Sequence, residues 1–176
     1  TLRCAFCAET NFWKNFRTRA PELVVDEMCA LADRLDSRVF HFCDSLVNAN
    51  RAWLAEFCDR VAEHDFAINF AYCQARGLTE ELVQAMAGAG FRALNFGVES
   101  GSDAMLERMH KGTTRKEMTN IIMWALRAGL MIDFPLLRNL PGETREDIWE
   151  TVGFIDNLEA SIGRESPRGG LAYSAD

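Results

Sequence analysis

The sequence predicts an α/β fold with a parallel sheet, because short apolar segments alternate with longer amphipathic ones along most of the chain. Strands are expected at 39–44, 66–72, 91–98 and 130–136, and a polar loop and then a helix follow each of them. Such a succession forms either a doubly wound sheet or a barrel, and in both cases ligands bind at the carboxyl ends of the strands. The loops that follow these strands are therefore the expected place for a functional site.

Helix boundary signals support this order of elements. Pro21 fits the first turn of a helix, and a capping box of Thr114 and Glu117 opens a later one. Further helices are expected after Asn50, from Thr79 to Gly90 and after Thr144, with a short additional helix at 102–109. No periodic pattern follows Gly163, so residues 1–162 are expected to form the domain and residues 163–176 an irregular tail.

The composition is that of one globular domain with no strong attraction to polyanions. Of the 176 residues, 48% are hydrophobic and 26% are charged, and the formal net charge is −7. A protein that coats nucleic acid or a membrane surface would instead carry a basic stripe. The apolar runs are far shorter than the ~20 residues of a membrane-spanning helix, and the first residues do not resemble a leader. We therefore expect a cytoplasmic protein without nucleic-acid or membrane partners.

The six cysteines fall into two groups. Cys4 and Cys7 lie three residues apart, a spacing that can clamp a metal, form a redox dithiol or supply part of an iron-sulfur site. A structural zinc site would need two more ligands nearby, whereas the three histidines are scattered singly. The other cysteines stand alone in apolar segments and are expected to be buried thiols: Cys29, Cys43, Cys58 and Cys73.

The segment Cys4-Ala5-Phe6-Cys7, together with motifs later in the sequence, resembles the conserved motifs of the radical S-adenosylmethionine (SAM) superfamily. Members carry C-x-x-x-C-x-x-C with an aromatic residue before the last cysteine, so the first cysteine is expected immediately before Thr1. The resemblance continues in order through F-C-D-S at 42–45, A-R at 75–76, G-V-E-S-G-S at 97–102, K-G-T at 111–113 and L-P-G-E-T at 140–144.

This resemblance implies a partial (β/α)6 barrel of the TIM type, truncated at both ends in this chain. Cys4 and Cys7 would be two of the three thiolates that hold a 4Fe-4S cluster, with SAM on the open iron. An electron donor would reduce the cluster, and cleavage of SAM would give a 5′-deoxyadenosyl radical for hydrogen abstraction or methyl transfer. The sequence does not indicate the substrate, which would be a small molecule or a peptide. With two motif cysteines, the fragment alone is expected to be inactive.

The strings at 97–102 and 140–144 are most similar to members that follow a cobalamin-binding domain. That similarity would add cobalamin as a cofactor, held by a domain outside this chain.

Two alternative functions belong to other classes of protein. One is a catalytically inactive barrel that acts as a binding or scaffold module. The other is a barrel enzyme that uses Lys111 as an imine-forming amine, which is disfavoured because Lys111 follows a helix rather than a strand.

Seven residues of the cysteine loop and the strand-end loops are candidates for cofactor binding: Phe6, Asp44, Ser45, Arg76, Glu99, Ser100 and Ser102. Phe6 offers a flat face to adenine, or shields iron from solvent. Asp44 and Glu99 can accept hydrogen bonds from an amino group or from ribose hydroxyls, and Arg76 can bind a carboxylate. Ordinary structural roles are the alternative: a turn or cap at Asp44, a surface ion pair at Arg76 and a helix cap at Ser102.

Overall fold

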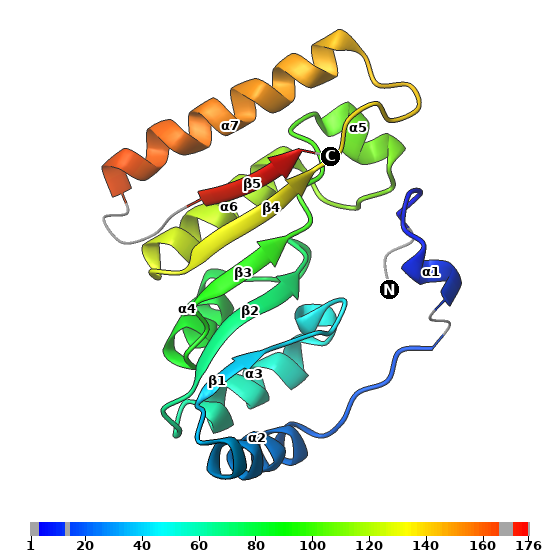
Figure 1. The fold of residues 1–176 in the computed structure, drawn as a ribbon. Coiled ribbons are helices and arrows are strands. Elements are labelled where there is room, and N and C mark those ends of the chain that lie inside the picture. The colour runs from blue at the N-terminus through cyan, green and yellow to red at the C-terminus, as the bar shows by residue number, and fades with distance from the viewer. Residues whose placement is uncertain (1–3, 13–14, 166–170, 176) are drawn as a thin grey trace.

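A computed structural model describes residues 4–12, 15–165 and 171–175. At its centre is one open sheet of parallel strands in sequence order: β1 (Val39–His41), β2 (Ala67–Cys73), β3 (Ala93–Phe96), β4 (Met131–Leu136) and β5 (Leu171–Ala175) (Figure 1). Parallel pairing needs a crossover between successive strands, and every crossover here contains a helix. The expected α/β fold with barrel-like strand order is confirmed, and the described strands do not close into a complete barrel.

The longer helices are α2 (Pro21–Leu35), α3 (Arg51–Val61), α4 (Glu80–Gly88), α6 (Arg115–Arg127) and α7 (Arg145–Glu165). Their starts agree with the sequence signals, since Asn50 and Thr79 cap α3 and α4, and Thr114 forms the expected capping box. The short elements are α1 (Glu9–Phe12), a 3-10 helix at Val47–Ala49, and α5 (Asp103–Arg108), of which the sequence predicts only α5. No helix in the described part of the chain combines the length and apolar character of a membrane span.

The expectation of an irregular tail from Gly163 is wrong in two places. Helix α7 continues to Glu165, and Leu171–Ala175 forms β5, which pairs in parallel with β4 from Ile132 to Leu136. The segment lacks the run of β-branched residues that marks a strand. Its pairing with the edge of β4 is a tertiary effect, which a local pattern does not report.

The main core lies between the helices and one face of the sheet. In Figure 1, α3, α4 and α6 lie behind the sheet and α2 lies below β1, and no helix crosses the face turned to the viewer. Both layers contribute side chains without solvent exposure, among them Leu54, Phe57, Ile68, Leu94 and Phe134. We call the opposite side, which no helix covers, the open face of the sheet.

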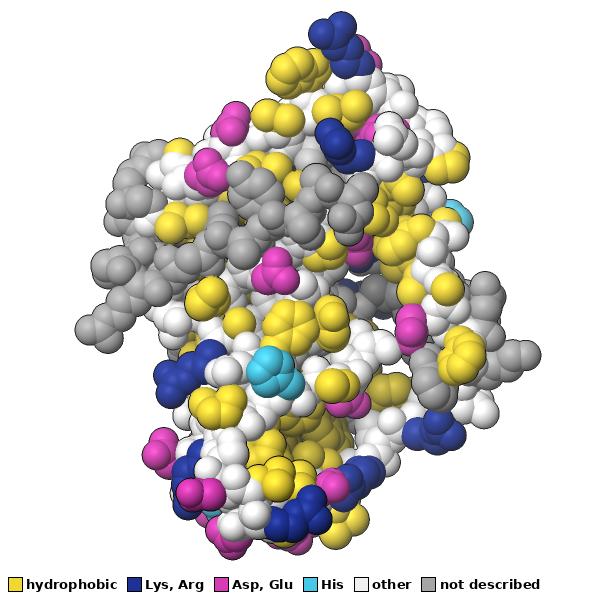
Figure 2. Space-filling view, in the orientation of Figure 1, with side chains coloured by type: hydrophobic (Ala, Val, Ile, Leu, Met, Phe, Trp, Pro, Cys, Tyr) yellow, Lys and Arg dark blue, Asp and Glu magenta, His cyan; other side chains and the backbone are white. Residues whose placement is uncertain are grey.

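A β-bulge in β2 decides which of its side chains reach the open face. Phe40 pairs with Ile68 but His41 pairs with Phe70, so Asn69 is an extra residue in β2. Ile68, before the bulge, is fully buried against the helices, whereas Tyr72, after it, is 43% exposed. Because side chains alternate along a strand, these residues would share a face without the bulge. Figure 2 shows hydrophobic side chains gathered around a histidine on the open face.

The cysteines outside the Cys4–Cys7 loop differ in environment. Cys58 and Cys73 are buried as expected, and burial raises the pKa of the Cys58 thiol to about 12 and that of Cys73 further. Cys29 is half-buried, with its Sγ 3.7 Å from Nδ1 of His64. The expectation for Cys43 is wrong: its thiol is exposed, because β1 ends at His41 and Cys43 already lies in the loop beyond it.

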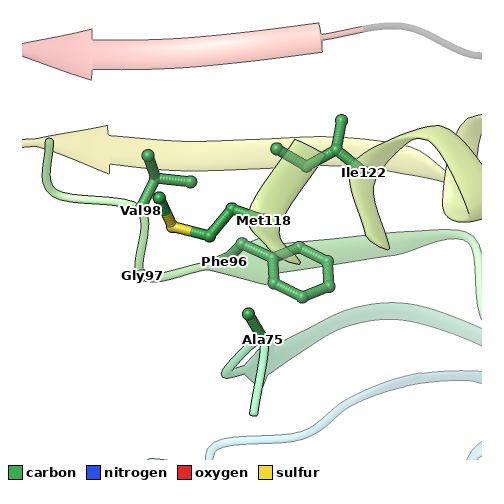
Figure 3. A pocket seen from close by; sticks show the side chains of 6 residues that line it. All are labelled: Ala75, Phe96, Gly97, Val98, Met118 and Ile122. Carbon is green, nitrogen blue, oxygen red and sulfur yellow. The ribbon is translucent and has the colours of Figure 1, made fainter. Parts of the chain in front are cut away.

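The loop that follows β3 rests on an apolar floor. Side chains of Phe96 from β3 and of Met118 and Ile122 from α6 meet below it (Figure 3). The narrow gap between them leaves no room for a water molecule. Helix α6 therefore supports this loop without intervening solvent.

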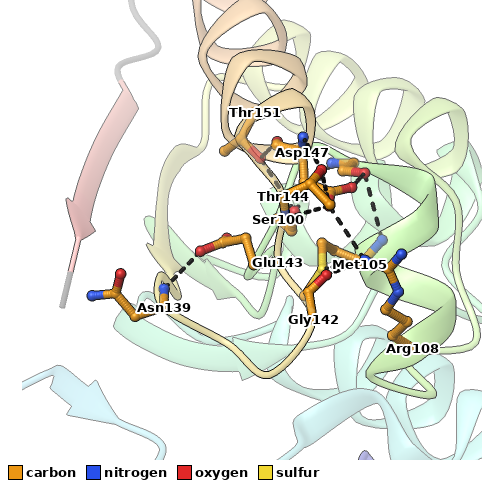
Figure 4. A network of polar contacts seen from close by, with 10 residues as sticks. Ser100, Met105, Arg108, Asn139, Gly142, Glu143, Thr144, Asp147 and Thr151 are labelled. Atoms are coloured by element: carbon orange, nitrogen blue, oxygen red, sulfur yellow. Dashed lines mark hydrogen bonds and ion pairs between the residues drawn. The ribbon is translucent and has the colours of Figure 1, made fainter.

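A polar network joins the start of α7 to α5 (Figure 4). Asp147 Oδ2 accepts from Thr144 N at 2.9 Å and from Thr144 Oγ1 at 2.7 Å, and its Oδ1 accepts from Ser102 Oγ at 2.6 Å. Arg108 Nη1 donates to the carbonyl of Gly142 at 2.6 Å and lies 3.3 Å from Asp147 Oδ2. The network fixes the loop between β4 and α7 against α5.

Because of this network, the stability of the fold depends on pH. The hydrogen bond from Ser102, then those from Thr144 and the charge of Arg108, lower the pKa of Asp147 from its ordinary value of 3.8 to about 2. Because the folded state favours the ionised carboxylate, Asp147 stabilises the fold fully above pH 3.8, and this contribution is lost as the pH falls toward about 2.

We therefore expect wild-type protein to lose more stability between pH 5 and pH 2 than Asp147→Asn does, although the variant is less stable at pH 5. Urea unfolding across that pH range measures the difference. Asp156→Asn, which changes an exposed carboxylate on the same helix, is the matched control and should follow the wild type. Parallel pH profiles of wild type and Asp147→Asn would contradict the assignment.

A second prediction concerns the close contact of Gly101 with α7. A Cβ at Gly101 would lie 2.6 Å from Cβ of Phe154 and 2.8 Å from Cα of Thr151. Since α7 would have to shift, Gly101→Ala should destabilise the fold by about 1–3 kcal/mol. Gly153→Ala, within α7 and with no atom near its added Cβ, should instead stabilise it by about 0.5–1 kcal/mol. Thermal unfolding of both variants distinguishes the two effects, and a stable Gly101→Ala protein would show that the contact is not tight.

Candidate functional site

The Cys4–Cys7 loop lies at the edge of the sheet where the strands end. Ala5 N donates to the carbonyl of Met109, at the end of α5, at 2.9 Å, and Cys7 N donates to the carbonyl of Cys4 at 3.2 Å. The second bond closes a turn that carries both thiols. Because α5 follows the loop after β3, the first bond ties the cysteines to the carboxyl ends of the strands.

Both thiols of this turn are half-buried. Burial raises the pKa of the Cys4 thiol, and the positive charge of Lys111 acts in the opposite direction. Among the described residues, no group of three or more His, Cys, Asp or Glu side chains is arranged to hold a metal ion. Neither Cys43 nor Cys73 therefore completes a three-thiolate site with Cys4 and Cys7 in this structure.

Glu99 is held in place by its backbone. Its φ is 67°, a left-handed conformation that costs a residue other than glycine about 1–3 kcal/mol. Hydrogen bonds to β4 and to the residue after it over-determine this conformation: Glu99 N donates to the carbonyl of Pro135 at 3.0 Å, and Leu137 N donates to the carbonyl of Glu99 at 2.9 Å. The sheet therefore aims the Glu99 side chain.

That side chain forms a buried ion pair. Oε1 of Glu99 accepts from Nζ of Lys111 at 2.8 Å, and both side chains are 9% exposed. The same ammonium lies 5.5 Å from the centre of the Phe6 ring. A Cβ at Gly97 would fall 2.6 Å from Nζ and 2.9 Å from Oε1, so glycine is what lets the pair fit under the chain. Carboxylate, ammonium and aromatic ring thus meet beside the two thiols.

The remaining sequence candidates divide between structural and exposed positions. Ser100 and Ser102 are almost completely buried, and their hydroxyls contact Thr151 Oγ1 at 3.2 Å and Asp147 Oδ1 at 2.6 Å. Ser102 also caps α5. Ser45 is exposed and donates from Oγ to Oε2 of Glu9 in α1 at 2.8 Å. The structure gives all three serines roles in holding loops together.

Asp44 and Arg76 lie at the ends of β1 and β2 and are exposed. Within the described ranges, their side chains form no hydrogen bond or ion pair. They share the edge with the cysteine loop but are not brought into contact with Glu99.

Sequence reasoning misses three residues of this edge, namely Lys111, Asn48 and Gln74. Lys111 stands in the K-G-T string, which is the available signal, yet the only role considered for it is that of an imine-forming amine. Buried Asn48 donates from Nδ2 to the carbonyl of Gln74 at 2.8 Å and accepts from Gln74 N at 3.0 Å, which fixes the end of β2. No local pattern marks this long-range clamp.

The side-chain oxygen of Gln74 is unusual in its hydrogen bonding. Its Oε1 is buried and, in the described part of the chain, has no hydrogen-bond partner. A buried acceptor without a donor costs about 1–3 kcal/mol, so a donor from a bound ligand would be favourable there. The two thiols are part of the ligand set that an iron-sulfur cluster requires, so the residues at this edge fit part of a cluster site and a ligand with N–H donors.

Sequence comparisons match this chain to a known family. The Radical SAM superfamily model matches residues 1–155. An uncharacterized methyltransferase of Pyrococcus horikoshii is 26% identical over 160 residues, which cover 90% of this chain and 35% of that protein. A ribosomal protein uS12 methylthiotransferase of Desulforudis audaxviator is 28% identical over 168 residues, 89% of this chain and 37% of that protein. The chain therefore spans about a third of the length of these relatives.

Solved structures share the fold. The radical SAM methyltransferase TsrM from Kitasatospora setae, solved with cobalamin and a [4Fe-4S] cluster, has a TM-score of 0.80 at 22% identity, over 98% of this chain and 32% of that one. Coproporphyrinogen III oxidase from Escherichia coli has a TM-score of 0.62 at 16% identity, over 97% of this chain and 41% of that one. The family match extends over most of the sequence, and the cysteine turn lies where the parallel strands end. The chain is a member of the radical SAM superfamily.

Proposed function

We propose that this chain is the core of an enzyme that binds a 4Fe-4S cluster and reductively cleaves SAM, for hydrogen abstraction or methyl transfer on a substrate. The observation that carries the proposal is the position of the Cys4–Cys7 turn. It is tied to α5 through Met109 and lies beside the buried pair of Glu99 and Lys111. When bound, the cluster would supply the electron that breaks the bond between the sulfonium and the 5′ carbon of SAM.

The residues of the edge have distinct tasks in this proposal. Cys4 and Cys7 are two of the cluster thiolates, and the third is the cysteine expected before Thr1. Glu99 accepts from the amino group or ribose hydroxyls of SAM, and Lys111 keeps that carboxylate from being an uncompensated buried charge. Gln74 Oε1 is a second acceptor for an N–H donor.

Phe6, which is 39% exposed, covers the ammonium of Lys111 on one side and can pack against adenine or shield the cluster with the rest of its surface. Asp44 and Arg76 form an outer pair of charges at the same edge, available to the amino and carboxylate groups of SAM. Ser45, Ser100 and Ser102 hold the surrounding loops and are not assigned as direct ligands.

Methyl transfer with cobalamin is the version of this function that the relatives favour. The matched sequences include methyltransferases and methylthiotransferases, and the TsrM structure contains cobalamin. Cobalamin would be held by a part of the protein outside these residues. An electron donor is required in either version, because cleavage of SAM consumes one electron.

The first test is cluster assembly. The chain as given should hold little stable cluster after anaerobic reconstitution with iron and sulfide, because two motif thiolates are fewer than the three or more that clusters require. Extension by the natural upstream residues should restore about four irons per chain, as a 4Fe-4S site has. Formation of 5′-deoxyadenosine from SAM by the extended, reduced protein would then support catalysis.

Two results would contradict the proposal. One is an upstream residue other than cysteine. The other is an extended protein that loads the cluster and never cleaves SAM, which would indicate a binding or scaffold module instead.

The second test is the role of Glu99. Glu99→Gln keeps a hydrogen-bond acceptor for Lys111 but leaves the buried ammonium without its counter-charge, so the folded variant should be less stable, and its SAM binding should weaken by about tenfold or more. Isothermal titration of SAM into the extended, reconstituted protein measures this change. Glu107→Gln, on the exposed side of α5, is the control and should bind like the wild type. Unchanged affinity in Glu99→Gln would remove this residue from the site.

A further inference from the structure

The open face of the sheet carries a row of polar and aromatic side chains away from the cysteine loop. Tyr72 pairs with Asn95, and Asn95 pairs with Asp133, so the three residues lie side by side across β2, β3 and β4. Their neighbours in sequence, such as Leu94, Phe96, Ile132 and Phe134, are buried under the helices. The row therefore faces the side that the helices leave uncovered.

Aromatic rings occupy the β1 and β2 end of this row. The rings of Phe70 and Tyr72 meet edge to face with centroids 4.9 Å apart, and the rings of His41 and Phe70 stack at 6.4 Å. His41 and Tyr72 are exposed. Figure 2 shows hydrophobic side chains beside a histidine on this face. Because the half-buried Phe70 ring meets the exposed Tyr72 ring at right angles, the two rings form an apolar corner, which we call the aromatic wall. An aromatic ligand could stack on one of these rings and meet the edge of the other.

A carboxylate stands at the other end of the row. Asp133 Oδ2 accepts from Asn95 Nδ2 at 2.7 Å, and both side chains are half-buried. Among the described residues, no Lys, Arg or His nitrogen pairs with Asp133. A half-buried carboxylate without a cation favours a ligand that brings an ammonium or an N–H donor.

We propose that this face binds the substrate, and that the substrate is a planar aromatic or heteroaromatic molecule with a cationic or N–H donor group. The ring would lie against Phe70 and Tyr72, and the donor would reach Asp133. Two strand spacings, about 10 Å, separate the backbones of β2 and β4, an interval that a ring with a short amine-bearing chain spans. The inference rests on the proposed function, because it places the substrate on the sheet whose carboxyl edge carries the cysteine turn.

The charge of Asp133 favours a cationic ligand over the other possible occupants of the open face. An anionic substrate would meet the Asp133 carboxylate in a chain whose net charge is already −7. An apolar partner surface, or further strands, would have to bury Asp133 without a counter-charge, which is costly. A planar cation satisfies both the wall and the carboxylate.

The test uses 2-phenylethylamine as the probe, with 3-phenylpropanoate as the probe of opposite charge and a similar aromatic body. Ligand-observed NMR on the reconstituted, upstream-extended protein measures the affinity of each. We expect the amine to bind at least about tenfold more tightly than the anion, and Asp133→Asn to remove that preference. Tyr72→Ala should weaken binding of the amine by a similar factor. Asp156→Asn, exposed on α7, is the control and should change nothing.

Three outcomes would overturn the inference: equal binding of the two probes, an unchanged preference in Asp133→Asn, or no binding of the amine. Sedimentation of Tyr72→Ala adds a fourth, because dissociation of an oligomer would make this face an interface between copies. Iron content and 5′-deoxyadenosine formation are measured in the same samples. A variant with intact cluster and SAM cleavage but altered probe binding separates failure of this inference from failure of the proposed function.

Discussion

The backbone of Glu99 is the constraint on which the rest of the site depends. Its left-handed conformation is possible because the chain is bonded to β4 on both sides of the residue. That geometry places a carboxylate below the chain, where only the missing side chain of Gly97 leaves room for the Lys111 ammonium. The strain at one residue is therefore compensated by sheet hydrogen bonds and by a buried ion pair.

Around Glu99, hydrogen bonds connect the loops of this edge to neighbouring elements. Met109 holds the cysteine turn, and the Ser102 and Asp147 contact holds the segment between β4 and α7 against α5. Asn48 performs the same service for the end of β2. Each fastening joins parts of the chain that are distant in sequence, so the edge behaves as one preorganised surface. Under the proposed function, preorganisation would matter because a cofactor that generates radicals must be held away from solvent and side reactions.

Sequence reasoning was most accurate where the signal is local. The starts of α3, α4 and α6 follow from the capping residues Asn50, Thr79 and Thr114, and the parallel order follows from alternating strand and helix patterns. It was least accurate where tertiary contacts decide. Strand β5 forms on the edge of β4, Cys43 is exposed by the early end of β1, and the partner of Glu99 lies twelve residues away. Ser100 and Ser102 are predicted from the sequence to bind the cofactor, but their hydroxyls bond to residues of α7, which no spacing rule reveals.

The bulge at Asn69 determines which side chains of β2 lie on the open face of the sheet. Residues after it alternate in the opposite phase from residues before it, so the aromatic wall owes its position to one inserted residue rather than to the identity of any ring. If Asn69 instead paired with His41 in a regular ladder, every later side chain of β2 would turn to the other face, and Ala71 and Cys73 would replace Phe70 and Tyr72 on the open face. The side chains that this face offers therefore depend on the pairing register of β2 with β1 as well as on the sequence of β2.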